Sequence, residues 1–150
     1  MKNAYHAVAL TNPTAKTAQE HIQKSELMYN TLKILQLNTR KQDMVQQSLL
    51  NDTGVKDFGA LAITEPYAWK SDKGLVITPL SHTKWDKIIP PIQHDGYWAI
   101  RSIIWIKKEL NSVQIRIEST DITAVIIRLK ERDIFLASVY VPGGDTEALR

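Results

Sequence analysis

The chain has 150 residues and a mass of 17.1 kDa, which is the size of one ordinary domain. Its hydrophobic (43%) and charged (23%) fractions are those of a globular protein, and 19 basic against 16 acidic residues give a net charge of +3, which permits a polyanionic partner without requiring one. The absence of cysteine excludes disulfide frameworks, thiolate metal sites and cysteine nucleophiles. No apolar run reaches the roughly 18 residues of a membrane span, and the N-terminus lacks a secretory signal, so we expect an intracellular protein, nuclear or cytoplasmic, that is not secreted.

Residues 1–31 differ in composition from the rest of the chain. They are polar and rich in Ala, Thr, Gln and Lys. The range 14–29 predicts one weak helix with a thin apolar stripe. We therefore interpret 1–31 as a loosely attached leader whose role cannot be inferred, and we place the domain at 32–150.

A strand–helix–strand unit opens the domain. The apolar run 32–37 predicts a strand, and the continuous small-apolar run 60–64 predicts a strand buried on both faces. Between them, residues 40–50 have helical spacing, and Thr39 with Gln42 matches a capping box. Two strands joined by a helix should be parallel, with a right-handed crossover.

The later half of the domain shows strand patterns that follow one another without helices. The candidate strands are 97–106, 113–117, 122–129 and 134–141. Short links join the last three, which is typical of hairpins. The chain is therefore predicted to be an α+β protein, with a mixed sheet at its start and an antiparallel meander after it.

The last two candidate strands, 122–129 and 134–141, are apolar on both faces, so both faces need cover. The chain offers only one good helix to provide it. Residues 142–150 have the pattern of a loop followed by an Asp-capped helix start. We infer that the domain is incomplete as given, and that a longer parent chain or a partner supplies the missing layers.

Two polar residues follow the parallel strands. Asn38 comes after the first and Glu65 after the second. Ligand sites of open sheets collect at the carboxyl ends of strands, and amide and carboxylate oxygens suit Mg²⁺ with water and phosphate completing its shell. Two other interpretations remain open: Asn38 as a turn or helix-capping residue, and Glu65 as a solvated strand end.

Three segments together resemble the endonuclease/exonuclease/phosphatase superfamily. They are residues 35–38 (Leu-Gln-Leu-Asn) followed by a helix, residues 61–67 (Leu-Ala-Ile-Thr-Glu-Pro-Tyr) and residues 137–142 (Ala-Ser-Val-Tyr-Val-Pro). With Trp69 nearby, the set is most similar to the endonuclease domain of LINE-type retrotransposons, notably fungal ones. The resemblance covers roughly residues 32–150, with the segments in the family's order and spacing.

The resemblance implies a four-layered α/β sandwich, incomplete here, and hydrolysis of phosphate esters with a divalent metal, usually Mg²⁺. In its terms Glu65 binds the metal, Asn38 helps to hold the metal shell and the phosphate, and Tyr140 lies beside the scissile phosphate. The metal neutralises charge on the phosphoryl oxygens and stabilises the leaving oxygen. Retrotransposon members nick one strand of target DNA, so DNA is the implied partner.

The sequence also departs from the family. The family's second half carries a Gly-Asp-x-Asn motif and ends in a Ser-Asp-His motif, and these 150 residues contain neither. None of the four histidines matches the second motif. We therefore expect the isolated chain to be inactive, and to need the missing C-terminal half of the domain or a reverse-transcriptase polyprotein. The alternative is a decayed fragment or a non-catalytic nucleic-acid-binding module.

Further residues are candidates for contacts with nucleic acid. These are Arg40, Lys41, Tyr67 and Trp69. Arg40 and Lys41 are expected to open the helix, where positive charge is unfavourable for the helix dipole and favours an anionic partner. Aromatic rings in loops can stack on bases, which applies to Trp69 and also to Trp85, whereas Trp105 lies in an apolar strand pattern and is expected in the core.

Two smaller features have ordinary interpretations. His82 and His94 flank a Pro-Pro pair, and a metal pair is conceivable, but loop histidines are usually solvated. Lys107 and Lys108 form a small basic cluster at a turn. The simpler interpretation is a pair of surface lysines, although phosphate contacts use the same residues.

Overall fold

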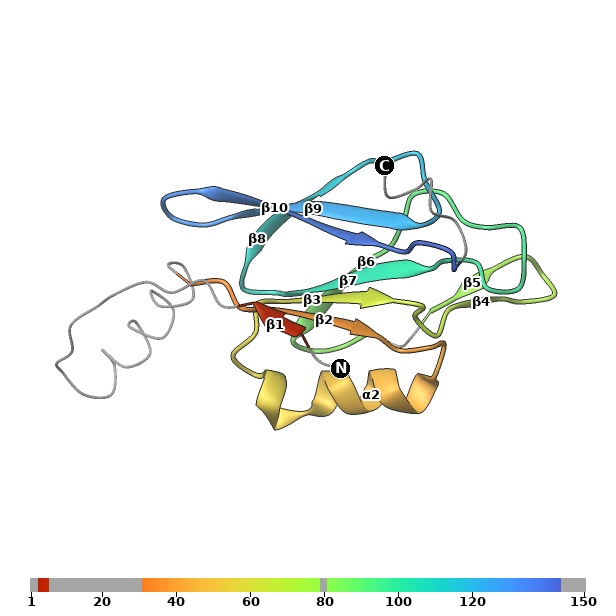
Figure 1. The fold of residues 1–150 in the computed structure, drawn as a ribbon, viewed down its shortest axis with the longest axis horizontal. Helices are drawn as coiled ribbons and strands as arrows, with labels where there is room; N and C mark the ends of the chain where they lie inside the picture. Colours follow the sequence, from red (N-terminus) through yellow and green to blue (C-terminus); the bar gives the residue numbers. More distant parts are fainter. Residues whose placement is uncertain (1–2, 6–30, 79–80, 144–150) are drawn as a thin grey trace, which may run out of the picture.

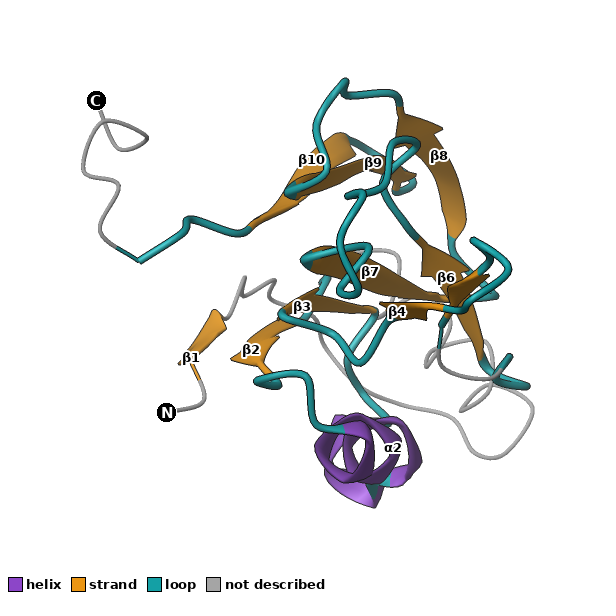
Figure 2. Ribbon diagram, turned by 90° about the vertical axis from the view of Figure 1, so that its right-hand side faces the viewer, coloured by secondary structure: helices purple, strands orange, loops and turns teal. Residues whose placement is uncertain are grey.

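In the part of the chain that the computed structural model describes, a larger sheet, a smaller sheet and helix α2 form three stacked layers (Figures 1 and 2). The structure describes residues 3–5, 31–78 and 81–143, so the helix predicted over 14–29 lies outside the described residues. Helix α2 covers one face of the larger sheet, and the smaller sheet packs on the other face. No helix in the described part of the chain is long and apolar enough to cross a membrane. The mixed and antiparallel strands confirm the predicted α+β class.

The larger sheet is mixed, as the sequence predicts. Its strands in spatial order are β1 (Asn3–Tyr5), β2 (Ile34–Asn38), β3 (Ala60–Thr64), β7 (Ser102–Lys107) and β6 (Trp85–Ile88). Only β2 and β3 are parallel among these pairs, with the helix between them in sequence. This confirms the predicted strand–helix–strand unit. A separate two-stranded hairpin pairs β4 (Trp69–Lys70) with β5 (Val76–Ile77).

Helix α2 (Asp43–Asn51) and the single 3₁₀ turn after it (Thr53–Val55) cover one face of the larger sheet. Apolar side chains one turn apart on this segment form a core with inward residues of the strands. The buried members of this core are Leu35, Leu49, Leu50, Val55, Leu61, Ile63, Trp85, Ile103 and Trp105. Trp105 is fully buried there, as its strand pattern predicts.

The smaller sheet is the predicted antiparallel meander. Its strands are β8 (Asn111–Ile115), β9 (Ile122–Arg128) and β10 (Asp133–Val139). A second core lies between the two sheets, with buried members Leu32, Ala60, Ile104, Ile106, Leu110, Val125, Ile127 and Leu129. Because strand β3 serves both cores, all five of its residues are buried.

The outer face of the smaller sheet is apolar and exposed. Val113, Ile126 and Phe135 form one cross-strand row on it, and Phe135 is 61% exposed. No element in residues 3–5, 31–78 or 81–143 packs against this face (Figure 1). The sequence predicts that both faces of these strands need cover, and the described part of the chain covers one.

One strand is shorter than predicted. The pattern over 97–106 predicts a strand from Tyr97, but β7 begins at Ser102. The preceding carbonyls accept hydrogen bonds from three separate segments: Tyr97 from Lys70, Ala99 from His94, and Arg101 from Glu65. This segment therefore forms part of the surface at the end of the sheet.

Truncating a side chain at the centre of the larger sheet should lower the stability of the domain substantially. Leu61 is 0% exposed, so Leu61→Ala should lower the free energy of unfolding by about 2–5 kcal/mol through lost burial and a residual cavity. Leu75→Ala is the control, because Leu75 is 62% exposed and its truncation should cost under about 0.5 kcal/mol. Urea denaturation followed by tryptophan fluorescence measures both, and equal costs would contradict the assigned core.

Candidate functional site

Asn38 and Glu65 lie at the same edge of the larger sheet. Asn38 is the last residue of β2 and is the register partner of Thr64, the last residue of β3, so Glu65 follows beside it. The side-chain oxygen of Asn38 accepts a hydrogen bond from the Arg40 amide at 2.8 Å. This is the turn role that the sequence leaves open, and a carbonyl oxygen keeps a second lone pair for another partner.

The backbone at this edge adopts an unusual conformation at three residues. Arg40 (φ 51°), Lys41 (φ 58°) and Glu65 (φ 48°) all occupy the left-handed region. For residues other than glycine such a conformation costs on the order of 1–3 kcal/mol each and persists only where surrounding contacts enforce it. Backbone strain of this kind concentrates at functional sites, which makes this edge a candidate independently of any motif.

A set of hydrogen bonds enforces this conformation. The Glu65 carbonyl accepts from both the Thr39 hydroxyl and the Lys41 amide, each at 2.7 Å. The Glu65 amide donates to the Arg101 carbonyl at 2.9 Å. Thr39 is 2% exposed, so water cannot readily replace its bond. We call these three hydrogen bonds the Glu65 clamp.

The clamp corrects the predicted start of the helix. The predicted capping box of Thr39 with Gln42 is wrong, because Gln42 and not Thr39 occupies the N-cap position, and the Thr39 hydroxyl donates to the Glu65 carbonyl. Helix α2 begins at Asp43, and Gln42, in the N-cap position, makes no side-chain cap. Arg40 and Lys41 therefore precede the helix, and its first turn carries Asp43, which the dipole favours.

The Glu65 carboxylate is partly enclosed and lies near a cation. Its side chain is 20% exposed, and the Lys41 ammonium is 3.7 Å from Oε1. The same ammonium lies 5.4 Å from the centre of the Trp98 ring. Lys41 can therefore exchange between a carboxylate, an aromatic face and an incoming anion without large backbone movement.

Tyr140, which follows strand β10 of the smaller sheet, is connected to this edge by its contact with Arg101. The Arg101 guanidinium lies 5.2 Å from the centre of the Tyr140 ring, and the Tyr140 amide donates to the Asp121 carbonyl at 2.9 Å. Arg101 also contacts the His94 ring and forms an ion pair with Asp121, in which Nε is 2.8 Å from Oδ1 although the N–H does not point along that line. Since the Arg101 carbonyl is part of the Glu65 clamp, one residue connects Glu65 to Tyr140.

Buried hydroxyls fix the two sheets to each other at this end. The Ser102 and Thr123 hydroxyls are hydrogen-bonded at 2.7 Å, and the Ser138 hydroxyl donates to the Ile63 carbonyl at 3.2 Å. We call Ser102, Thr123 and Ser138 the hydroxyl seam. Each of its bonds lies within two residues of Glu65, Arg101 or Tyr140, so the seam determines how the two halves of the site face each other.

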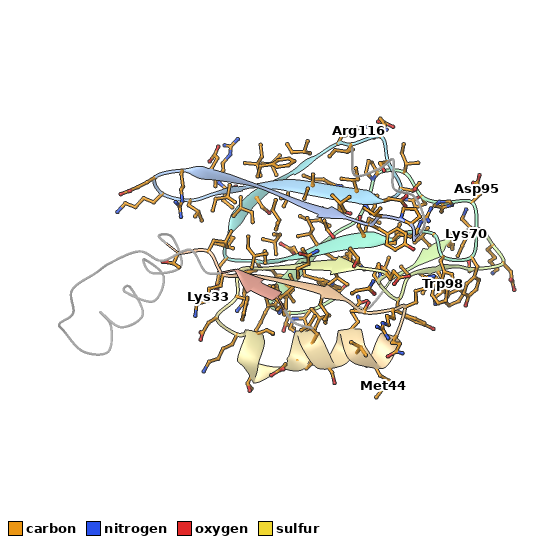
Figure 3. The ribbon with its side chains drawn as sticks, viewed as in Figure 1. Lys33, Met44, Lys70, Asp95, Trp98 and Arg116 are labelled. Atoms are coloured by element: carbon orange, nitrogen blue, oxygen red, sulfur yellow. The ribbon has the colours of Figure 1, made fainter. Side chains whose placement is uncertain are left out.

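An aromatic cluster lies next to Glu65. Trp69 stacks on Tyr97 with ring centroids 5.8 Å apart, and Trp98 makes edge contacts with Tyr97 and with Tyr67. Tyr97 is 57% exposed. Figure 3 shows Trp98 and Lys70 at this end of the molecule, far from Lys33 at the other end. The sequence pointed to Tyr67 and Trp69 but missed Tyr97 and Arg101.

Trp85 does not lie in the aromatic cluster, and His82 and His94 have separate partners. Trp85 is 3% exposed and lies in the core under helix α2, so its predicted place in a loop at the site is wrong. His94 contacts Arg101, whereas His82 is hydrogen-bonded to the Lys84 amide. No group of three or more His, Asp or Glu side chains that could hold a metal ion occurs among the residues that the structure describes.

The oxygen ligands at Glu65 and Asn38 fit a Mg²⁺ ion that is shared with a phosphate and water, but not one held by protein ligands alone. Mg²⁺ in phosphate-processing sites is held by one or two carboxylates, with water and substrate oxygens completing an octahedron. One carboxylate and one amide oxygen, at Glu65 and Asn38, satisfy that requirement at its minimum. They cannot form a cage made of protein ligands alone, so a metal here depends on a phosphate or on further protein ligands.

Comparison with known proteins shows the fold. No family model matches the chain, and no curated protein matches its sequence. Among solved structures, the chain is similar to the endonuclease domain of TRAS1, a telomere-specific non-LTR retrotransposon, with a TM-score of 0.58 and 17% sequence identity. The match covers 79% of this chain and 50% of that chain, so the chain spans about half the length of the structure that it resembles.

The Glu65 clamp generates a test. Thr39→Val keeps the shape of a buried side chain but removes the hydroxyl that the Glu65 carbonyl accepts from, and should lower the free energy of unfolding by about 1–3 kcal/mol. Thr53→Val, at an exposed position, is the matched control and should change it by less than about 0.5 kcal/mol. Urea denaturation gives both values. An unchanged stability of Thr39→Val would show that the clamp does not hold the strained turn.

Proposed function

We propose that this chain provides the metal-binding half of a Mg²⁺-dependent site that nicks DNA. The observation that supports the proposal most is the placement of Glu65: a carboxylate carried by a strained, clamped backbone at the carboxyl end of β3, beside Asn38, in a fold similar to a retrotransposon endonuclease domain. Backbone strain at Glu65 and the similarity of the fold support the proposal more strongly together than either does alone.

Each residue has a role that follows from its chemistry. Glu65 and Asn38 supply hard oxygen ligands at one edge. When bound, Mg²⁺ neutralises charge on the phosphoryl oxygens and stabilises the leaving oxygen. The Tyr140 hydroxyl can donate a hydrogen bond to a phosphate oxygen, and Arg101 positions its ring. Lys41 offers its ammonium to the same phosphate and, in its absence, reduces the repulsion that Glu65 exerts on a polyanion.

The chain lacks the groups that would complete the reaction. Its 150 residues contain no Gly-Asp-x-Asn and no Ser-Asp-His segment. Among the described residues, Glu65 is not part of any group of three or more His, Asp or Glu side chains that could hold a metal ion. We therefore propose that the general acid–base half comes from a second segment, and that the 150-residue chain binds DNA without cleaving it.

The proposal predicts that the purified chain does not nick supercoiled plasmid in Mg²⁺ above the rate without protein. Metal binding is followed separately, by Mn²⁺-induced line broadening in NMR spectra. Broadening should centre on residues around Glu65 and disappear in Glu65→Ala, while Asp72→Ala, at an exposed turn, should leave it unchanged.

Two results would contradict this assignment. Plasmid nicking that disappears in Glu65→Ala would show that the chain is active by itself. Broadening that persists in Glu65→Ala would show that the metal does not bind at this edge.

The aromatic cluster favours a second candidate function, which is binding of nucleic acid without chemistry. Trp69 and Tyr97 present stacked rings at the surface, with the Lys41 ammonium against Trp98. Stacking platforms beside cations bind unpaired bases with little sequence preference. This function needs neither a metal nor the missing motifs, and it is compatible with a chain that has lost catalysis.

Binding to a short fluorescent single-stranded oligonucleotide, followed by anisotropy, tests the aromatic cluster. Trp69→Ala should weaken binding roughly 10-fold through lost base stacking, and Lys41→Met should reduce the slope of log K against log salt concentration by about 0.7. Phe135→Ala removes an exposed aromatic ring on the other sheet and Lys130→Met an exposed lysine. These two controls should bind the oligonucleotide like the unmodified chain. If each control loses as much affinity as its matched variant, the binding surface lies elsewhere.

A further inference from the structure

A polar pocket lies at the opposite end of the larger sheet from Glu65. It has a volume of about 370 Å³. The Lys107 amide donates to the Gly59 carbonyl there, just before β3 begins, whereas Glu65 follows the other end of β3. Six residues of extended chain separate these ends, which is about 20 Å at roughly 3.3 Å per residue. Lys33, whose carbonyl accepts from the Gly59 amide, marks this end in Figure 3.

Lys107 lines the pocket and is not the surface lysine that the sequence suggests. It is 8% exposed. Its ammonium donates to the Lys56 carbonyl at 2.7 Å and lies 5.1 Å from the centre of the Trp85 ring. Among residues 31–78 and 81–143, no carboxylate lies within 4 Å of this ammonium to form an ion pair. A buried cation that lacks a counter-ion is costly, so the position favours an anion that binds from outside.

Other cations line the same pocket. Lys56, Lys84 and His82 share it with Lys107, and Asp52 is the one acidic lining residue in the described part of the chain. The Asp52 carboxylate accepts from the Gly54 amide at 2.7 Å, so part of its hydrogen-bonding capacity is used locally. The lining side chains therefore carry a net positive charge with His82 neutral.

His82 reports this positive environment. Burial lowers the pKa of His82 below its usual value, and the charges of Lys84, Lys108 and Lys107 lower it further. Its Nδ1 accepts a hydrogen bond from the Lys84 amide at 3.1 Å, so the neutral ring carries its proton on Nε2 and can donate from there. An anion in the pocket would offset the lysine charges and favour the protonated ring.

We propose that this pocket, lined by Lys56, Lys84, Lys107 and His82, binds a phosphate group. Ammonium groups and an imidazole N–H are donors that phosphate accepts, and a phosphate dianion would compensate the buried charge of Lys107. The phosphate can belong to a free ion or small ester, or to a nucleic-acid backbone, because the same donors serve each. The site is independent of Glu65 and of any hydrolysis at the other end of the sheet.

The test follows the His82 ring by NMR in the full 150-residue chain, with the signal assigned by its loss in His82→Gln. A pH titration is run in chloride and in inorganic phosphate at equal ionic strength. Binding coupled to protonation should raise the apparent pKa of His82 in phosphate, by about one unit if the charged ring binds phosphate tenfold more tightly than the neutral ring.

Variants test whether the lysines provide the site. Lys84→Met and Lys107→Met should each reduce the phosphate-dependent change in the His82 pKa at least severalfold, whereas Lys73→Met, at an exposed turn, should leave it unchanged. Lys84 is exposed, so its variant keeps the test valid if Lys107→Met fails to fold. The same change in all three variants would overturn the proposal.

A short oligonucleotide in place of inorganic phosphate distinguishes the two sources. A pKa change in phosphate assigns the site to a free ion or small ester, and a change with the oligonucleotide alone assigns it to a nucleic-acid backbone. No change with either probe overturns the proposal. The phosphate-dependent change in the His82 pKa should persist in Glu65→Ala. Failure of the phosphate site is therefore distinguishable from failure of the proposed metal site.

Discussion

The candidate site depends on one carbonyl oxygen. The backbone oxygen of Glu65 accepts hydrogen bonds from the Thr39 hydroxyl and the Lys41 amide, and thereby ties the end of β3 to the turn after β2. Without these bonds, three left-handed residues in two separate segments would relax, and the Glu65 carboxylate would lose its orientation. These hydrogen bonds to the Glu65 carbonyl therefore determine three features: the turn before helix α2, the position of Lys41 and the orientation of the Glu65 side chain.

The site is formed by two sheets, and the hydroxyl seam determines how they meet. Ser102 and Thr123 join β7 to β9, and Ser138 joins β10 to the backbone of β3. Buried hydroxyls that are fully bonded fix the register of packed sheets more strictly than apolar contacts, because a shift would leave them without partners. Arg101 and Tyr140 face each other for this reason. The seam is thus the structural link between the edge that carries Glu65 and the strand that leads to Tyr140.

The sequence predicts the elements of this fold better than the contacts of its site. Periodicity identifies the parallel pair, the helix and the meander, because burial on one or both faces leaves a direct pattern in the residues. It fails at Thr39, where a capping motif is overridden by a partner 26 residues away. It fails also at Trp85 and Lys107, which resemble loop and surface residues but are buried by packing between distant segments. Arg101 leaves only a weak signal, a single charge beside a buried strand, and its role emerges only when Tyr140 is brought to it.

The Ser138–Ile63 hydrogen bond has a consequence for the rate at which the chain folds. Its partners are 75 residues apart in sequence, and β3 acquires its antiparallel neighbour β7 only after some forty intervening residues have been placed. Closing loops of that length costs conformational entropy before any contact repays it, so proteins dominated by such pairings fold in milliseconds to seconds, orders of magnitude more slowly than helical bundles of similar size. During that interval the apolar strands of the smaller sheet are unprotected, and the chain depends most on dilution or on chaperones.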